Sequence, residues 1–119
     1  MKYKIIKADI FKFNVSNKTN WLFTRLQNNS GLYGWGEATL QGKEFEILKK
    51  KNDILQIILN SKFNSPFDLK PKLPFNNIVE ASISSSIMQC LWDIFSRENG
   101  QSIGEMFSNT KNDYIPIYA

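Results

Sequence analysis

The sequence contains no histidine and only one cysteine in 119 residues. Without histidine, the chain has no imidazole to serve as a general base or a metal ligand near neutral pH. A single cysteine cannot form a disulfide within the chain, and Cys90 lies in the apolar run IMQCLWDIF, which is typical of a small buried side chain. We therefore predict an inert thiol and a reducing compartment, the cytoplasm.

Long apolar runs and a strong charge of one sign are also missing. No stretch of about 18 apolar residues is present, so the sequence predicts no membrane-spanning helix. The N-terminal MKYKIIKADIFKF mixes lysines with apolar residues and has no unbroken apolar core of the kind found in a signal peptide. The formal net charge of +4 is small. We predict neither a membrane partner nor a nucleic-acid partner.

The composition is that of a folded protein. Hydrophobic residues make up 42% of the chain and charged residues 22%, which is close to the average for globular domains. A chain of 119 residues is long enough for one domain with one modest core.

The first part of the chain alternates between apolar and polar residues, as strands do. Residues 3–13 and 21–27 are predicted to be strands. The polar stretch 14–20, NVSNKTN, is predicted to be a loop between them, and NNSG at 28–31 is predicted to be a turn.

The segment GLYGWGEATL at 31–40 is the most unusual stretch. In a strand covering 32–39, one face carries Tyr33, Trp35 and Glu37, and the other carries Gly34, Gly36 and Ala38. A phosphate-binding loop needs glycines that open a helix, and here the spacing is GxxGxG within a strand-like pattern. The small stripe therefore favours close approach of another backbone over ligand binding.

The rest of the chain has helical periodicity. Residues 43–60 are predicted to form a helix with Lys49–Lys51 facing solvent and an apolar face of Phe45, Leu48, Ile54, Leu55, Ile57 and Ile58. Residues 61–77 are a proline-rich connector with one short helical turn. A core helix is predicted over 78–98, ended by Asn99-Gly100, and a short helix is predicted to begin after Ser102 with Glu105 in capping-box spacing. These elements predict an α+β fold: a three-stranded antiparallel meander followed by a helical bundle.

Several dispersed motifs occur in an informative order: GLYGWGEATLQG, then ASISSSIMQCLWDIFSRENGQSIGEMF, then IPIYA. In this order they resemble the N-terminal capping domain of the enolase superfamily, in the mandelate racemase and muconate lactonizing enzyme subgroup. The resemblance covers nearly the whole chain. Three features depart from the family pattern: Cys90 replaces a small alanine, Ser108-Asn109 replaces a glycine pair, and the connector 61–77 is short.

The resemblance implies a division of labour between two domains. Residues 1–112 would be the capping domain, and residues 113–119 would begin the first strand of a (β/α)₇β barrel. In the family, the barrel abstracts the proton α to a carboxylate and stabilises the enediolate on Mg²⁺. The resemblance therefore implies a barrel partner, a magnesium ion held by that barrel and a carboxylate substrate at the shared interface. It also implies no catalytic residue, no metal ligand and no activity in this chain alone.

In the family, two capping-domain loops select the substrate. By position, they correspond to 14–20 and 39–43, and the candidate residues are Asn14, Ser16, Asn17, Lys18, Thr19, Thr39, Gln41 and Lys43. Their polar side chains suit hydroxyl-rich or carboxylated ligands, and Lys18 or Lys43 would contact an acid group. The alternative is that both segments are ordinary solvated loops.

Other conspicuous residues are predicted to be structural. We expect Glu37 to bond to backbone near the second loop, Trp92 and Asp93 to pack in the core and at a domain interface, and Trp21 and Trp35 to be core residues. The segment GWGEATLQGKE favours a sugar-acid dehydratase over a racemase. The resemblance also implies a possible homo-oligomer, because members of the family commonly form them. The competing hypothesis is a stand-alone α+β binding or interaction module without catalysis, which exposed apolar surface would argue against.

Overall fold

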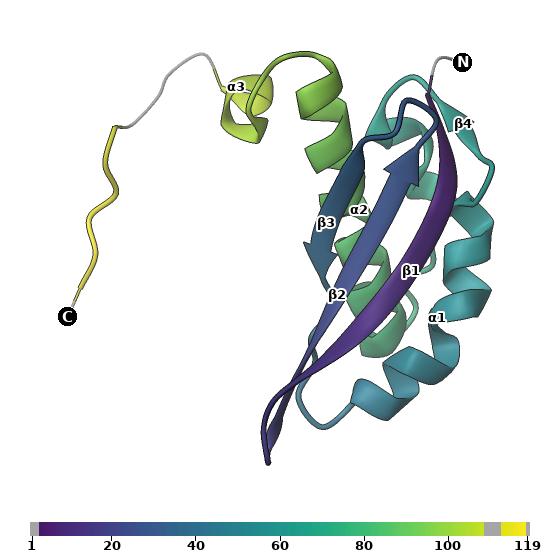
Figure 1. Ribbon diagram of the computed structural model, residues 1–119, viewed down its shortest axis with the longest axis vertical. Coiled ribbons are helices and arrows are strands. Elements are labelled where there is room, and N and C mark those ends of the chain that lie inside the picture. Colours follow the sequence, from purple (N-terminus) through teal and green to yellow (C-terminus); the bar gives the residue numbers. More distant parts are fainter. Residues whose placement is uncertain (1–2, 109–112, 119) are drawn as a thin grey trace.

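One antiparallel sheet lies against two long helices in the computed structural model of the protein, which describes residues 3–108 and 113–118 (Figure 1). The strands are β1 (Tyr3–Ser16), β2 (Thr19–Asn28), β3 (Tyr33–Glu37) and β4 (Lys62–Phe63), in the order β3-β2-β1-β4. The α+β class and the three-stranded meander are confirmed. The sequence did not predict β4, which has two residues and pairs with the start of β1.

The hairpin of β1 and β2 is longer than predicted. Residues 14–20 do not form a loop as a whole, because only Asn17 and Lys18 make the turn and Ser16 still pairs with Thr19. Asn14 lies opposite Asn20, and its Nδ2 donates to the Asn20 Oδ1 at 2.9 Å and to the Ser16 carbonyl at 2.9 Å. These side-chain bonds stabilise strand pairing in a segment whose composition is typical of turns.

The helices are α1 (Glu44–Ile58), α2 (Ile78–Glu98) and the short α3 (Ile103–Phe107), with 3₁₀ turns η1 (Pro66–Asp68) and η2 (Lys70–Lys72) in the connector. The Asn77 side chain caps the start of α2, and Gly100 follows its end with a φ of 66°, a conformation that glycine adopts at little cost. The predicted capping box of Ser102 and Glu105 is confirmed at the start of α3.

The predicted apolar face of α1 is confirmed at Ile54, Leu55 and Ile58, but not at its first residue, Phe45. Its buried residues are Ile47, Ile54, Leu55 and Ile58, whereas Phe45 is 75% exposed. Phe45 precedes Ile47 by two residues, which places the two side chains about 200° apart around the helix. Lys51 does not face solvent as predicted, because its Nζ lies 2.8 Å from the Asp9 Oδ1 and 3.0 Å from the Ile10 carbonyl of β1.

The glycine stripe of β3 lies directly against the backbone of α2. A Cβ atom added at Gly34 would be 2.3 Å from the Cys90 carbonyl oxygen, and one added at Gly36 would be 2.2 Å from the Ser86 carbonyl oxygen. This confirms that the glycines serve close packing.

Cys90 is fully buried, and its Sγ donates to the Thr24 carbonyl at 3.3 Å. Burial raises the pKa of the Cys90 thiol, so the group stays protonated at neutral pH.

Two further predictions concern the ends of the chain. The boundary at residue 112 lies outside the described residues. Residues 113–118 form neither helix nor strand, and the side chains of Ile115 and Ile117 are exposed. Their assignment to a barrel strand stays a prediction.

Among the described residues, no helix is both long and apolar enough to cross a membrane.

The contact between β3 and α2 predicts that one methyl group added to β3 greatly lowers the stability of the fold. Gly36→Ala should lower the free energy of unfolding by about 3 kcal/mol or more, because the new Cβ would overlap a backbone oxygen that cannot move alone. Urea unfolding followed by circular dichroism measures this. Gly104→Ala is the matched control, since a Cβ there meets only the Ser102 Oγ at 3.8 Å, and its effect should stay within about 1 kcal/mol. Equal stability of the Gly36→Ala variant and the wild type would contradict the packing described.

Candidate functional site

The two segments predicted to select a ligand lie at the same end of the sheet, the lower end in Figure 1. The Ala38 amide donates to the Leu22 carbonyl at 2.8 Å, and the Leu22 amide donates to the Thr39 Oγ1 at 3.0 Å. The segment 39–43 therefore leaves the sheet beside β2, while the β1–β2 hairpin continues past this point to its turn at Asn17 and Lys18.

The segment 39–43 is shaped by a tight turn. The Lys43 amide donates to the Leu40 carbonyl at 2.9 Å, and Gly42 has a φ of 83°. A positive φ at the third position of a four-residue turn is typical of type II, which favours glycine there. The turn leaves the side chains of Gln41 and Lys43 exposed immediately before α1 begins.

Six of the eight candidate residues fall into two groups, and the other two, Asn17 and Thr19, lie at the hairpin turn. Asn14, Ser16 and Thr39 use their side chains to hold the backbone, since the Ser16 Oγ accepts from the Lys18 amide at 3.3 Å and the other two make the bonds described above. By contrast, no side-chain hydrogen bond or ion pair joins Lys18, Gln41 or Lys43 to the rest of the described chain. The candidates that remain available to a ligand include two cations and one amide, and this division could not be predicted from the sequence.

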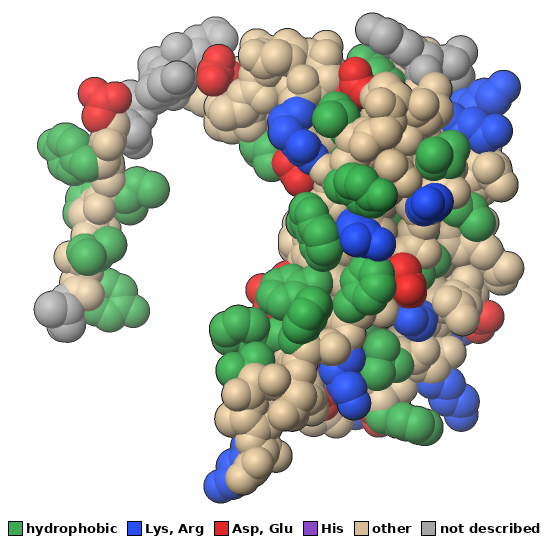
Figure 2. Space-filling view, in the orientation of Figure 1, with side chains coloured by type: hydrophobic (Ala, Val, Ile, Leu, Met, Phe, Trp, Pro, Cys, Tyr) green, Lys and Arg blue, Asp and Glu red, His purple; other side chains and the backbone are tan. Residues whose placement is uncertain are grey.

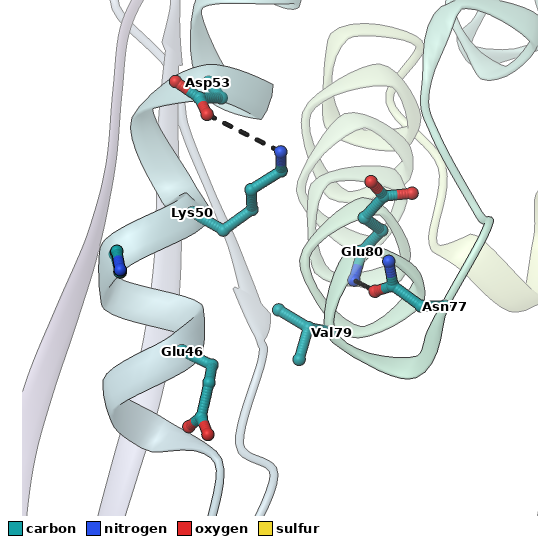
Figure 3. Close-up of a pocket in the computed structure, with 7 residues that line it drawn as sticks. Glu46, Lys50, Asp53, Asn77, Val79 and Glu80 are labelled. Atoms are coloured by element: carbon teal, nitrogen blue, oxygen red, sulfur yellow. Dashed lines mark hydrogen bonds and ion pairs between the residues drawn. The ribbon is translucent and has the colours of Figure 1, made fainter.

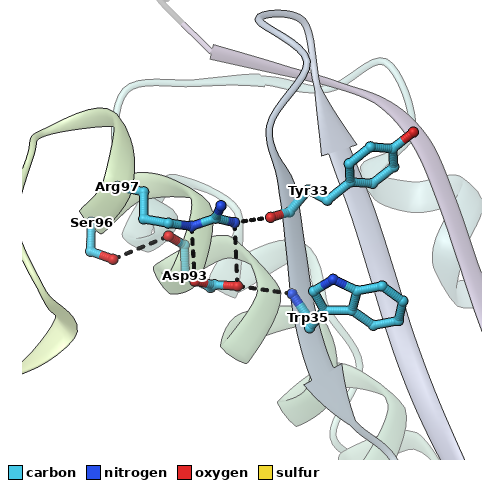
Figure 4. Close-up of polar contacts among 5 residues, drawn as sticks. All are labelled: Tyr33, Trp35, Asp93, Ser96 and Arg97. Carbon is cyan, nitrogen blue, oxygen red and sulfur yellow. Dashed lines mark hydrogen bonds and ion pairs between the residues drawn. The ribbon is translucent and has the colours of Figure 1, made fainter.

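A polar contact between α2 and β3 was also not predicted. Gln89, Asp93 and Arg97 are spaced four residues apart on α2 and face the open edge of β3. The Glu37 amide donates to the Gln89 Oε1 at 2.8 Å, and the Trp35 amide donates to the Asp93 Oδ2 at 3.1 Å. The Arg97 Nη2 donates to the Tyr33 carbonyl (Figure 4).

These three side chains, which we call the edge ladder, satisfy backbone groups that an edge strand otherwise leaves open to a further strand. Arg97 and Asp93 also pair, with 3.2 Å between the Arg97 Nε and the Asp93 Oδ1. Asp93 therefore accepts a bond from the backbone of its own domain, and its expected place at a domain interface stays a prediction. At Glu37 the backbone amide makes the structural bond, whereas its carboxylate is exposed. The four-residue spacing of polar side chains on α2 is the signal that could have revealed the ladder.

An apolar hollow of about 620 Å³ lies beside Trp92. The Trp92 ring is half-buried and packs 5.1 Å from the Phe67 ring and 4.5 Å from the Phe107 ring, measured between centroids. Phe75, Met88 and Ile103 line the same hollow. Trp92 thus joins α2, η1 and α3, and it leaves apolar surface open to solvent.

The prediction that Trp21 and Trp35 are core residues was wrong. They are 45% and 48% exposed, because they point to the face of the sheet that α1 and α2 do not cover. Figure 4 shows the side chains of Tyr33 and Trp35 pointing away from α2.

A second hollow, of about 520 Å³, lies between α1 and the start of α2 (Figure 3). Its charged groups have both signs, and Lys50 already pairs with Asp53 at 3.6 Å. Asn77 caps the amide of Glu80 at 2.9 Å. Across residues 3–108 and 113–118, no three carboxylate, cysteine or histidine side chains converge as a metal site would require. The described residues therefore do not fit a magnesium ion.

Comparison with curated proteins finds relatives among dehydratases. The D-galactonate dehydratase of Variovorax paradoxus is 21% identical over 104 residues, which covers 83% of this chain and 27% of the relative. That of Xanthomonas campestris pv. campestris (strain B100) is 21% identical over 103 residues, with 82% and 27% covered. The chain thus spans about a quarter of the length of these relatives. No protein-family model matches the sequence.

Solved structures show the same fold. A mandelate racemase/muconate lactonizing protein from Paracoccus denitrificans PD1222, in complex with magnesium, matches with a TM-score of 0.73 and 22% identity, covering 88% of this chain and 30% of that one. A mandelate racemase/muconate lactonizing enzyme from Jannaschia sp. CCS1 matches with a TM-score of 0.77 and 18% identity, covering 92% and 32%.

The fold is that of an N-terminal capping domain of the enolase superfamily. The chain is similar to part of the mandelate racemase/muconate lactonizing proteins and of the D-galactonate dehydratases described above.

The edge ladder predicts slow amide exchange at an edge strand. Asp93→Ala should speed hydrogen exchange of the Trp35 amide about tenfold or more, because that amide loses its acceptor. Exchange followed by nuclear magnetic resonance measures the rate residue by residue. Asp53→Ala, which removes an exposed carboxylate from α1, is the matched control and should leave the Trp35 rate unchanged. Unchanged Trp35 exchange in the Asp93→Ala variant would show that the carboxylate does not protect the edge.

Proposed function

We propose that the chain is the capping and substrate-specificity domain of a magnesium-dependent enolase-superfamily enzyme that acts on a carboxylate substrate, of the sugar-acid dehydratase or racemase type. The observation that carries the proposal is the placement of two polar segments, 14–20 and 39–43, at one end of a rigid sheet. Binding residues often lie on loops that a rigid scaffold positions. In this proposal residues 1–112 form the cap and residues 113–119 begin the barrel.

The role of this chain in the reaction is binding, not chemistry. Lys18 and Lys43 are exposed ammonium groups without partners among the described residues, and an ammonium group attracts a carboxylate. Gln41 and Asn17 add amide groups that hydrogen-bond hydroxyls. The abstraction of the α-proton and the stabilisation of the resulting enediolate on magnesium belong to the barrel in this proposal. The metal is therefore assigned to the barrel and not to this chain.

A dehydratase is the more specific form of the proposal. The curated relatives described above are D-galactonate dehydratases, and a sugar acid offers both a carboxylate and a row of hydroxyls. Lysines together with amide and hydroxyl side chains suit that combination better than a purely apolar lining would.

The exposed apolar surface favours a cap over a stand-alone module. The hollow beside Trp92 is lined largely by aromatic and aliphatic side chains, and Phe67 and Phe107 are well exposed there. A stand-alone module is expected to have a more polar surface, whereas a cap leaves such a patch for its neighbouring domain. Trp92 is then part of the domain interface, as its position in the sequence predicts.

The coding sequence beyond Ala119 and the activity of its complete product test the proposal. A continuing frame with a lysine base and three spaced acidic ligands is expected. In the complete product, Lys43→Ala or Lys18→Ala should raise KM for a sugar acid about tenfold and change kcat less than about twofold, since either substitution removes ground-state binding of the carboxylate.

Lys62→Ala on β4 is the matched control, because it removes an exposed lysine from a strand that pairs with the start of β1, away from the hairpin turn. Its KM should equal that of the wild type. A kcat that falls in the lysine variants while KM stays constant would instead assign these residues to the chemical step. The absence of barrel-coding sequence would overturn the proposal.

The 119-residue chain alone should bind no magnesium with meaningful affinity and should turn over no sugar acid. Carboxylate groups do not converge within the described residues, and hard cations need several oxygen ligands. Titration calorimetry with magnesium chloride measures the first expectation, and a coupled dehydratase assay measures the second. Tight one-to-one binding of magnesium to this chain would contradict the assignment of the metal to the barrel.

A further inference from the structure

Two exposed apolar parts of the chain lie close together along the sequence. The first is the hollow beside Trp92, of about 620 Å³, at which Phe67 and Phe107 are well exposed. The second is the segment 113–118, DYIPIY, which we call the tail. Its two isoleucines and two tyrosines are 80–98% exposed, and Figure 2 shows the apolar side chains of the tail apart from the sheet and helices. Exposed apolar groups of this extent mark interaction sites.

The tail is tethered to the hollow itself. Phe107 lines the hollow and is the last residue of α3, and five residues separate it from Asp113. Six steps along a chain span at most about 20 Å, which limits how far the start of the tail can lie from Phe107. A short tether of this kind gives the tail a local concentration in the millimolar range at the hollow. Even a weak contact between them is therefore populated.

The sequence of the tail suits an open apolar hollow. Pro116 fixes its own φ and favours an extended Ile115, so the tail loses little conformational freedom when it binds. In an extended segment Ile115 and Ile117 point to one side, and Tyr114 and Tyr118 point to the other. The isoleucines can therefore enter the hollow while the tyrosine hydroxyls stay in water.

The charges around the hollow also match the tail. Lys70 lines the hollow and is exposed, and no ion pair joins it to another residue of the described ranges. Asp93, the other charged residue of the lining, is already paired with Arg97 at 3.2 Å. Asp113 begins the tail and is exposed. An ion pair between Lys70 and Asp113 would contribute little energy but would fix the direction in which the tail lies.

The outer face of the sheet is a poorer site for the tail. This face exposes Trp21 and Trp35, but the guanidinium of Arg25 lies among its rings, 4.9 Å from the centre of the Phe11 ring. Asp9 lies opposite Arg25 in the pairing of β1 with β2. The isoleucines of the tail would cover both charges and return no hydrogen bond for the hydration lost.

We propose that the tail binds in the hollow beside Trp92 of the same chain, with Ile115 and Ile117 against the rings of Trp92 and Phe107. The bound tail covers apolar surface that no other part of the chain covers. The inference uses only the hollow and the tail, so it does not rest on the proposed capping function. A barrel of the kind proposed above would compete with this contact, because it takes the tail as a strand and covers the hollow.

Nuclear magnetic resonance of the 119-residue chain tests the proposal directly. Nuclear Overhauser effects are expected between the methyl protons of Ile115 or Ile117 and the ring protons of Trp92. Their intensity relative to effects within the core should be the same at about 100 μM and about 1 mM protein, because a contact within one chain does not depend on concentration.

A variant of the tail gives a second measurement. Trp21→Phe and Trp35→Phe leave Trp92 as the only tryptophan, so its fluorescence can be followed alone. In this background, Ile115→Ser with Ile117→Ser should raise the acrylamide quenching constant of Trp92 about twofold, because the tail then leaves the ring uncovered for most of the time. Phe45→Ser is the matched control, since it removes an exposed apolar side chain from α1 and should leave the quenching constant unchanged.

Three results would overturn the proposal: no Overhauser effect between the tail and Trp92, effects that weaken on dilution, or equal quenching with and without the two serines. Weakening on dilution would place the tail on another copy of the chain. Because both isoleucines are well exposed, the serine variant is expected to keep its fold, which circular dichroism checks. No readout depends on activity, so a failure here is distinguishable from a failure of the proposed function.

Discussion

The approach of the α2 backbone to the backbone of β3 is the contact on which the other features depend. Gly34 and Gly36 have no Cβ atoms, and the places where Cβ atoms would stand lie 2.2–2.3 Å from carbonyl oxygens of α2. At this separation Gln89, Asp93 and Arg97 reach the edge of β3. This short separation also requires small side chains between the sheet and α2. Thr24, Ser86 and Cys90 are buried there, and the hydroxyl oxygens of Thr24 and Ser86 lie 2.6 Å apart. Close packing and a closed sheet edge are therefore two results of one contact.

Both long helices cover the same face of the sheet, and this divides the surface of the molecule. The outer face keeps its aromatic side chains exposed, the end with 14–20 and 39–43 keeps its polar side chains available, and the far side of α2 exposes the hollow beside Trp92. Each surface has its own chemistry: stacked rings with a central cation, lysines with amides, and an apolar hollow. One small domain therefore has three surfaces of different chemistry.

The comparisons establish the fold of the chain. The chain matches about 27–32% of the length of its relatives, and within residues 3–108 and 113–118 no group of side chains could hold a metal ion. A shared fold does not establish an activity, because chemistry resides in particular groups at a site. The groups proposed to bind a ligand lie at the end of the sheet, where loop composition can change without disturbing the packing of α2 on β3.

Features that depend on local interactions were predicted from the sequence. The bounds of α2, the capping box at Ser102, the glycine at the end of α2 and the small stripe of β3 follow from periodicity, capping and the absence of a side chain, each of which acts within a few residues. The position of 39–43 after β3 was predictable for the same reason. Contacts between elements far apart in the sequence were not predicted. The length of the hairpin, the pairing of β4, the exposure of Trp21 and Trp35, and the partners of Asp93 and Lys51 depend on which elements meet across many residues. Alternation along a strand separates its two faces, but only the tertiary packing of α1 and α2 decides which face they cover.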